Sequence, residues 1–147
     1  MADKRQIESS PGDKSGIEAT GEFTPQFDDK GLMPVIAQDA KTGQVLMFAY
    51  MNREAIDTTI QTGFATYFSR TRQKLWKKGE QSGHVQKVEQ ILVDCDQDCL
   101  ILKVSVDKGQ CHAGYQSCFY RALRKDTPDK LQFIAEKVYD PAKVYKK

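Results

Sequence analysis

Two short stretches hold most of the residues in this sequence that could do chemistry. The first is Asp94-Cys95-Asp96-Gln97-Asp98, and the second runs from Cys111-His112 to Cys118. Crowded carboxylates repel one another unless protons or a cation neutralise them. Oxygen-only clusters suit hard ions such as Mg²⁺ or Ca²⁺, whereas thiols suit a softer ion such as zinc. We therefore expect the two stretches to meet at one metal site.

The carboxylates are expected where a strand ends and turns back, because Val93 ends one apolar run and Leu100 begins another. Alternate residues of an extended chain share a face. The three carboxylates should then point one way and Cys95 the other. One pentapeptide could in this way serve two different metals.

Plainer interpretations compete with a metal site. The acidic spacing resembles the start of an EF-hand loop, but Cys99 and Ser105 stand where that loop needs Gly and Glu. The carboxylates could also form an acidic turn without an ion. The cysteines could be buried thiols or disulfides, and four cysteines allow three pairings.

The composition indicates a soluble globular protein of one domain. The sequence has 147 residues, of which 39% are hydrophobic and 29% charged. No apolar run is long enough to span a membrane, and the polar N-terminus gives no signal peptide. We therefore expect a cytoplasmic protein whose cysteines serve metal binding or catalysis instead of disulfides. A net charge of +2 is too small to argue for nucleic-acid binding.

The pattern of apolar residues predicts an α+β fold, mainly β in a single domain, with one or two short helices. Residues 1–22 are polar and are expected to be a flexible extension, so the packed domain would span 23–147. Asn52 is a candidate helix cap and Gly63 the stop of that helix. Apolar stretches predict the remaining elements, at 32–38, 45–50, 64–69, 85–93, 100–106, 119–123 and 131–139.

Residues 70–83, the basic stretch, hold five basic side chains, one carboxylate and the only tryptophan. Arginine forks suit phosphate, and the face of Trp76 suits a flat ring. Gly79 and Gly83 would let backbone N–H groups approach an anion. We interpret the stretch as an anion-binding loop. A solvated loop with an ordinarily packed tryptophan, or a loop that binds nucleic acid, are the alternatives.

Over residues 32–122 the sequence resembles the phosphoribosyl-AMP cyclohydrolase family. The resemblance depends on motifs that occur in a fixed order: Ala49-Tyr50-Met51-Asn52, Ser69-Arg70-x-Arg72-x-x-Leu75-Trp76-x-Lys78-Gly79-x-x-Ser82-Gly83, Asp94-Cys95-Asp96-x-Asp98 and Cys111-His112-x-Gly114-x-x-Ser117-Cys118-Phe119. That family opens the adenine ring of phosphoribosyl-AMP in histidine biosynthesis by hydrolysing the bond between N1 and C6. Some members carry a fused pyrophosphohydrolase domain, but we expect a single activity here.

The resemblance implies an intertwined, mainly β homodimer that binds two metals and a small nucleotide, with no nucleic-acid or membrane partner. The implied zinc ligands, shared between subunits, are Cys95, Cys111 and Cys118. The implied magnesium ligands are Asp94, Asp96 and Asp98. The implied substrate-binding residues are Ser69, Arg70, Arg72, Trp76, Lys78 and Ser82. Cys99 matches no ligand position.

The expected chemistry is consistent with these residue types. Three protein ligands leave zinc a fourth position for water, which is the catalytic arrangement, and zinc deaminases likewise attack a purine at C6. His112 is the first candidate for general base and later acid, and His84 is the second. Mg²⁺ would either bind a substrate phosphate or hold the turn that orients Cys95. The alternative function is a structural-zinc module, closed by Cys99 or His112, with a nucleic-acid- or phosphate-binding loop.

Overall fold

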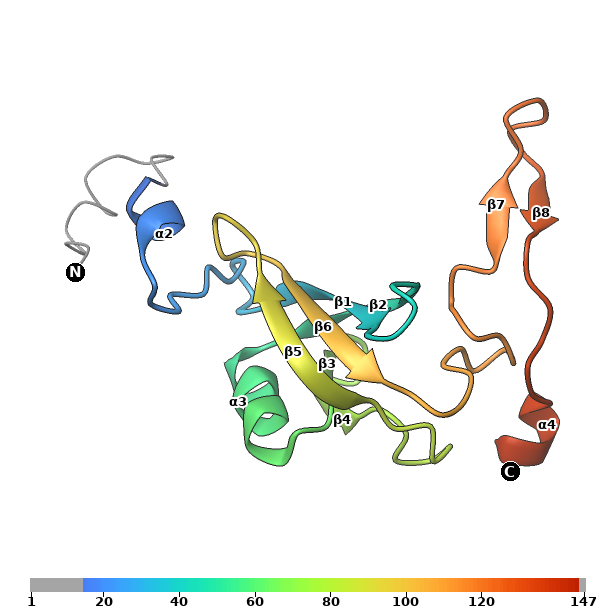
Figure 1. Ribbon diagram of the computed structural model, residues 1–147, viewed down its shortest axis with the longest axis horizontal. Coiled ribbons are helices and arrows are strands. Elements are labelled where there is room, and N and C mark those ends of the chain that lie inside the picture. The colour runs from blue at the N-terminus through green and yellow to red at the C-terminus, as the bar shows by residue number, and fades with distance from the viewer. Residues whose placement is uncertain (1–14, 146–147) are drawn as a thin grey trace.

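The computed structural model describes residues 15–145 (Figure 1). Most of the predicted N-terminal extension, residues 1–14, therefore lies outside the described residues. The described chain is mainly β, with one ten-residue helix and two single-turn helices. None of the helices in the described part is long and apolar enough to cross a membrane.

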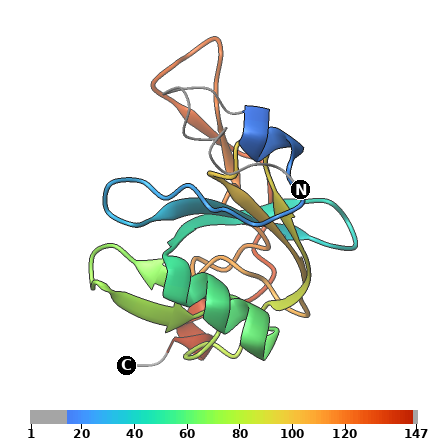
Figure 2. The same cartoon turned by 90° about the vertical axis from the view of Figure 1, so that its left-hand side faces the viewer.

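One six-stranded sheet forms the body of the molecule, in the order β4-β3-β2-β1-β6-β5. Its strands are β1 (Met33–Asp39), β2 (Val45–Met51), β3 (Thr66–Ser69), β4 (Lys74–Lys77), β5 (Lys87–Val93) and β6 (Leu100–Ser105). Strands β1 and β6 pair in parallel, and the other pairs are antiparallel. The sheet curls so far that Phe64, just before β3, forms a bridge with Lys87 of β5. Figure 2 shows this curl, with α3 below it.

The core is built from buried residues of β1, β2, β3, β6 and α3, and two of these strands show a regular alternation of burial. Every second residue of β1 is buried, and so is every second residue of β6 from Leu100 to Val104. Successive side chains of a strand point to opposite faces, so one face of each strand supplies the core. The predicted burial of one face of β6 is confirmed.

Helix α3 (Arg53–Thr62) begins and ends where its capping residues predict. The Asn52 side chain accepts a hydrogen bond from Ala55 N at 2.8 Å, and Gly63 adopts φ 81°. The Gly63 N–H donates to Thr59 O at 2.9 Å. These contacts satisfy backbone groups that a helix otherwise leaves unpaired. The helix packs Ala55 and Ile56 against the sheet next to β2 and β3.

One part of the chain differs from the prediction, and the N-terminal segment adds a short element. The basic stretch is not a continuous loop, because Lys74–Lys77 forms β4, which pairs with β3. A turn at 69–73 allows this pairing: Gln73 takes φ 54°, and its N–H donates to Ser69 O at 2.8 Å. In the expected flexible extension, α2 (Ser15–Ala19) is a helical turn whose Ile17 is buried.

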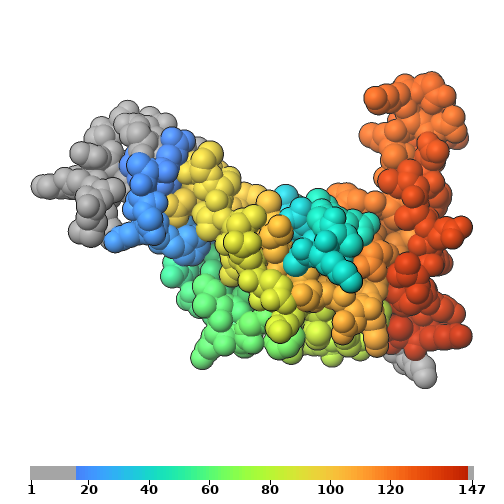
Figure 3. All heavy atoms as spheres, in the orientation of Figure 1, coloured from blue at the N-terminus to red at the C-terminus, as the bar shows by residue number. Residues whose placement is uncertain are grey.

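The C-terminal part leaves the sheet after β6. Strands β7 (Arg121–Leu123) and β8 (Leu131–Phe133) form a two-stranded hairpin, and α4 (Pro141–Val144) follows. The hairpin stands clear of the rest of the molecule (Figures 1 and 3). It exposes large apolar side chains, among them Leu123, which is 71% exposed, and Phe133, which is 61% exposed.

Candidate metal and substrate site

The carboxylate turn, residues 94–99, connects β5 to β6. Asp94, Asp96 and Asp98 each offer an oxygen, and these oxygens lie within 4.8 Å of one another. They gather through a turn and not through an extended chain, so the predicted strand-like alternation is wrong. Gln97 takes φ 59°, and Asp94 Oδ1 accepts hydrogen bonds from the N–H groups of Asp98 at 2.9 Å and Cys99 at 3.2 Å.

The gathered carboxylates affect one another's ionisation. Hydrogen bonds with Asp96 and then Asp94 raise the pKa of Asp98 to about 6. A raised pKa means that the protein disfavours three negative charges at this place. A hard divalent cation would relieve the same repulsion, so the donor set fits Mg²⁺.

Gln97 anchors the N-terminal segment to this turn. Its Oε1 accepts a hydrogen bond from Thr24 N at 2.7 Å. Its Nε2 donates to Glu22 O at 3.1 Å and to Ile17 O at 3.3 Å. The side chain is 5% exposed, so these bonds replace its contact with water. Gln97 was not singled out from the sequence, because its contacts lie more than seventy residues away along the chain.

The thiol loop, residues 109–118, brings two cysteines together. The Cys118 N–H donates to Leu46 O at 2.7 Å, which fixes the end of the loop on β2. Cys118 is exposed as a residue, but surrounding atoms desolvate its thiol. This desolvation, together with the adjacent Cys111, raises the pKa of Cys118 to about 12. Two thiols that oppose each other's ionisation are suited to a soft cation such as zinc.

Cys95 lies apart from these two thiols. Within residues 15–145, the three cysteines do not form a group whose sulfurs lie within 4.8 Å of one another. The carboxylate turn and the thiol loop lie at opposite ends of β6 (Figure 1). The expectation that the two stretches meet at one site is therefore not met within a single chain.

The two histidines have different surroundings. His112 is exposed on the thiol loop, next to Cys111. His84 is 4% exposed, and its Nδ1 lies 2.6 Å from Gly109 O. Its ring meets the ring of Tyr139 edge-on, with centroids 4.7 Å apart. One nitrogen of His84 is thus already hydrogen-bonded and its ring is enclosed, whereas the His112 ring is open to solvent.

The basic stretch lines a cavity of about 120 Å³. Its lining includes Arg72, Trp76, Lys77, Lys78, Ser82 and Tyr145. Pockets that enclose a drug-sized ligand measure about 300–1,000 Å³, so this cavity suits a group the size of a phosphate. Four of the six expected substrate-binding residues therefore line one small cavity, in which three cations outnumber one carboxylate, Glu80.

Lys78 connects the basic stretch to the thiol loop. It is 7% exposed, and its Nζ donates to Gln110 O at 2.7 Å. Burial lowers the pKa of its ammonium group, and the nearby Cys118 and Cys111 thiols oppose this shift. The Gln110 side chain accepts a hydrogen bond from Gln86 Nε2 at 2.9 Å. A positive charge is thus held beside the two thiols.

Comparisons with known proteins identify the family. The sequence model of the family described as phosphoribosyl-AMP cyclohydrolase matches residues 47–120. A relative of that name from Methanococcoides burtonii is 59% identical over 122 residues, which is 83% of this chain and 96% of the relative. The chain belongs to the phosphoribosyl-AMP cyclohydrolase family. A relative of the same name from Methanocella arvoryzae is 57% identical over 83% of this chain, and one from Rhodopseudomonas palustris is 49% identical over all of both chains.

The part that matches the cyclohydrolase family contains the basic stretch, the carboxylate turn and the thiol loop. Residues 121–145 lie beyond it, although the relative from R. palustris aligns over the whole chain. Tyr139 and Tyr145 lie within residues 121–145, and their place at the candidate site was not predicted from the sequence. The sequence contains no motif that connects them to the thiol loop or to the basic stretch.

Three of the expected substrate residues of this family member are engaged with neighbouring groups of the protein. The Arg70 guanidinium carbon lies 4.1 Å from the centroid of the Tyr50 ring. Ser69 Oγ accepts a hydrogen bond from Arg72 N at 3.2 Å. Trp76 packs against Tyr67, with ring centroids 5.2 Å apart. Trp76 therefore supports the sheet as well as lining the cavity.

Proposed function

We propose that this chain is a phosphoribosyl-AMP cyclohydrolase, which hydrolyses the bond between N1 and C6 of the adenine ring in histidine biosynthesis. The observation that carries the proposal is the family match over residues 47–120, which contains every group of candidate site residues. Relatives that bear this name are 59% and 57% identical to the chain. The proposal assigns a place to each of the charged features described above.

The cavity of the basic stretch would receive a phosphate of the substrate. The cations Arg72, Lys77 and Lys78 line it, and a phosphate carries the opposite charge. A cavity of about 120 Å³ cannot enclose a whole nucleotide, so the adenine ring would lie outside it. The ring would then lie near the thiol loop, because Lys78, which lines the cavity, donates a hydrogen bond from Nζ to the carbonyl of Gln110, the residue before Cys111.

Cys111 and Cys118, with Cys95 from a second copy of the chain, would hold zinc. When bound there, zinc would supply a water of lowered pKa and positive charge at the site of attack. His112 would accept a proton from the attacking water and return one to ring N1, which is released from C6 as a nitrogen of the formamidine group that keeps its bond to C2. The products balance, since oxygen from water is added to C6 and hydrogen to N1. The carboxylate turn would hold Mg²⁺ and keep Cys95 in position.

The separation of the thiols supports a homodimer. Cys111 and Cys118 lie together, and Cys95 is at the far end of β6, so a second chain would complete the proposed set of three. The β7–β8 hairpin supports this, because its exposed apolar side chains need a partner surface. A dimer with twofold symmetry would have two equivalent zinc sites, each built from the carboxylate turn of one subunit and the thiol loop of the other.

The direct test is turnover of phosphoribosyl-AMP by the purified protein, with zinc and Mg²⁺ supplied and both metals measured per chain. We expect the ring-opened carboxamide to form and about one zinc to bind per chain. No turnover in the presence of both metals would refute the enzyme assignment. Cys99→Ser separates the catalytic site from a closed structural site: we expect zinc to be retained, whereas a site closed by Cys99 would lose it.

A further inference from the structure

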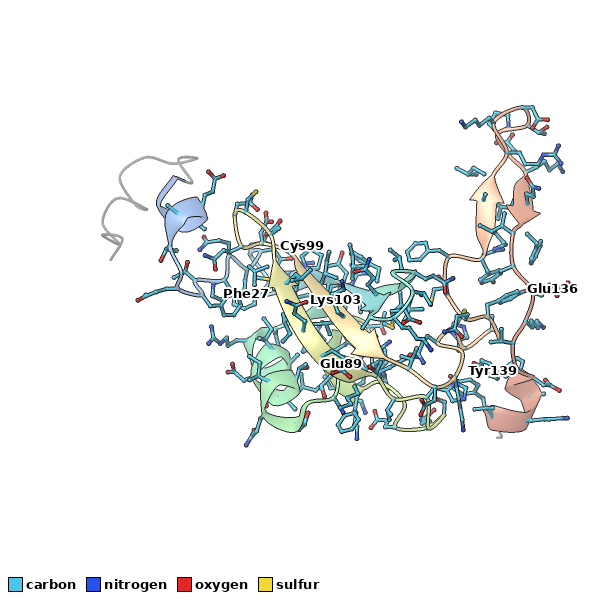
Figure 4. The ribbon with its side chains drawn as sticks, in the orientation of Figure 1. Phe27, Glu89, Cys99, Lys103, Glu136 and Tyr139 are labelled. Atoms are coloured by element: carbon cyan, nitrogen blue, oxygen red, sulfur yellow. The ribbon has the colours of Figure 1, made fainter. Side chains whose placement is uncertain are left out.

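The C-terminal strap, residues 137–145, lies beyond the family match and yet contacts both the thiol loop and the cavity of the basic stretch. We infer that the strap is part of the substrate site and that Tyr145 is a positioning residue for a phosphate monoester bound in the cavity. The inference rests on the proposed function for the identity of the whole substrate, but not for the phosphate. Figure 4 labels Tyr139, which lies on this strap just before α4.

The strap is fastened to the thiol loop by backbone and side-chain hydrogen bonds. The N–H groups of Val138 and Tyr139 donate to Gly114 O at 2.7 and 3.3 Å. The Tyr139 hydroxyl donates to Cys111 O at 2.5 Å. These bonds hold the strap against the residues that flank the thiols.

The fit between strap and loop depends on two glycines. A Cβ atom at Gly114 would lie 2.7 Å from Tyr139 O, and one at Gly109 would lie 2.6 Å from a methyl carbon of Val138. Real Cβ atoms do not approach other atoms so closely. Gly114 also takes φ 101°, which disfavours other residues. The loop is thus shaped to receive the strap.

The strap ends in the wall of the cavity. Helix α4 is capped by Asp140, whose Oδ1 accepts from Ala142 N at 3.0 Å, and the Tyr145 N–H donates to Pro141 O at 2.9 Å. These bonds place Tyr145 among the residues that line the cavity, together with Lys78 and Arg72. A partly buried ring there limits the access of water to the cations and so strengthens their attraction for an anion.

The two tyrosines connect the cavity to the thiol loop. A side-chain hydrogen bond joins Tyr139 to Tyr145. The Tyr139 hydroxyl in turn donates to Cys111 O, so the Tyr145 side chain lies next to a residue that is fastened to the thiol loop. Tyr145 acts on the cavity through its ring, which forms a wall.

The test compares four full-length proteins: wild type, Tyr145→Ala, Tyr145→Phe and the control Lys143→Ala. Lys143 is exposed on α4, two residues before Tyr145, and does not line the cavity. We expect Tyr145→Ala to raise KM for phosphoribosyl-AMP about tenfold, with kcat within about twofold of wild type. Tyr145→Phe keeps the ring and should restore the wild-type KM, as should Lys143→Ala.

Inorganic phosphate provides a second measurement that does not depend on turnover. Its dissociation constant, from calorimetry, should rise in Tyr145→Ala by the same factor as KM. If wild type binds phosphate but does not turn over phosphoribosyl-AMP, the proposed function fails and the phosphate comparison still tests Tyr145. Unchanged KM and phosphate affinity in Tyr145→Ala, or a loss confined to kcat, would overturn the inference. Should that variant fold poorly, Tyr145→Leu replaces it, with a KM between those of wild type and Tyr145→Ala expected.

Discussion

The separation of Cys95 from Cys111 and Cys118 makes a quantitative prediction about mixed dimers. If each site takes Cys95 from one subunit and the other two thiols from its partner, Cys95→Ser and Cys118→Ser should each be inactive alone. A mixed dimer of the two variants, however, contains one site with all three thiols. Its other site lacks two of them.

The recovered activity follows from counting sites. Random exchange of equal amounts of the two variants gives mixed dimers as about half of the population, since the partners of a twofold dimer are interchangeable. One of the two sites in each mixed dimer is intact. The mixture should therefore recover about a quarter of the wild-type activity per chain, provided that sites act independently.

The assay is ring opening of phosphoribosyl-AMP after the two variants are mixed, with tags of different mass so that native mass spectrometry counts mixed dimers. The matched control is a mixture of Cys111→Ser with Cys118→Ser. Both of these thiols lie on one loop, so every site in a mixed dimer still lacks a thiol, and no activity should return. Abundant mixed dimers without recovered activity in the first mixture would refute the shared site.

Three further outcomes are expected. His112→Ala should retain zinc but lower kcat by about 100-fold or more, and an unchanged kcat would remove the assignment of His112 as general base. Hydrogen bonds with its neighbours raise the pKa of Asp98 from 3.8 to about 6. Protonated Asp98 therefore stabilises the metal-free fold at low pH, and this stabilisation is lost as the pH rises through about 6. Added Mg²⁺ should consequently raise Tm more at about pH 7.5 than at about pH 5, and Asp98→Asn should abolish the difference. Gln97→Ala should lower the free energy of unfolding in urea by about 1–3 kcal/mol, because buried backbone partners lose their bonds, whereas Gln90→Ala, on the exposed face of β5, should change it by less than about 0.5 kcal/mol.

Strands β1 and β6 and the long helix could be predicted because their signals are local. Alternation marks β1 and β6, and Asn52 and Gly63 mark the ends of α3. Strand β4 was missed because Lys74 and Lys77 flank its two apolar residues, so the segment looked like a charged loop. The segment is a strand because it pairs with β3, which supplies the backbone hydrogen bonds.

The candidate site was predicted in its residue types but not in its arrangement. The spacing of the aspartates correctly suggested that their carboxylates gather, yet the cause is the left-handed backbone at Gln97, which no periodicity reveals. The role of the strap could not be read from Tyr139 or Tyr145, because their partners are fixed by tertiary packing. Gly114 carried the one usable signal, since a glycine beside candidate ligands often marks the close approach of another segment.

The position of β6 has a consequence for the maturation of the protein. This strand starts at the carboxylate turn and leads toward the thiol loop, and it enters the sheet by pairing in parallel with β1, which is far away in the sequence. Such distant pairings form slowly compared with hairpins. A nascent or misfolded chain therefore presents its aspartates and cysteines on unrelated, unsupported segments with low affinity for ions. If the chain binds the proposed metals, their loading is a late event, and the metal content of a preparation would report how much of it has reached the native state.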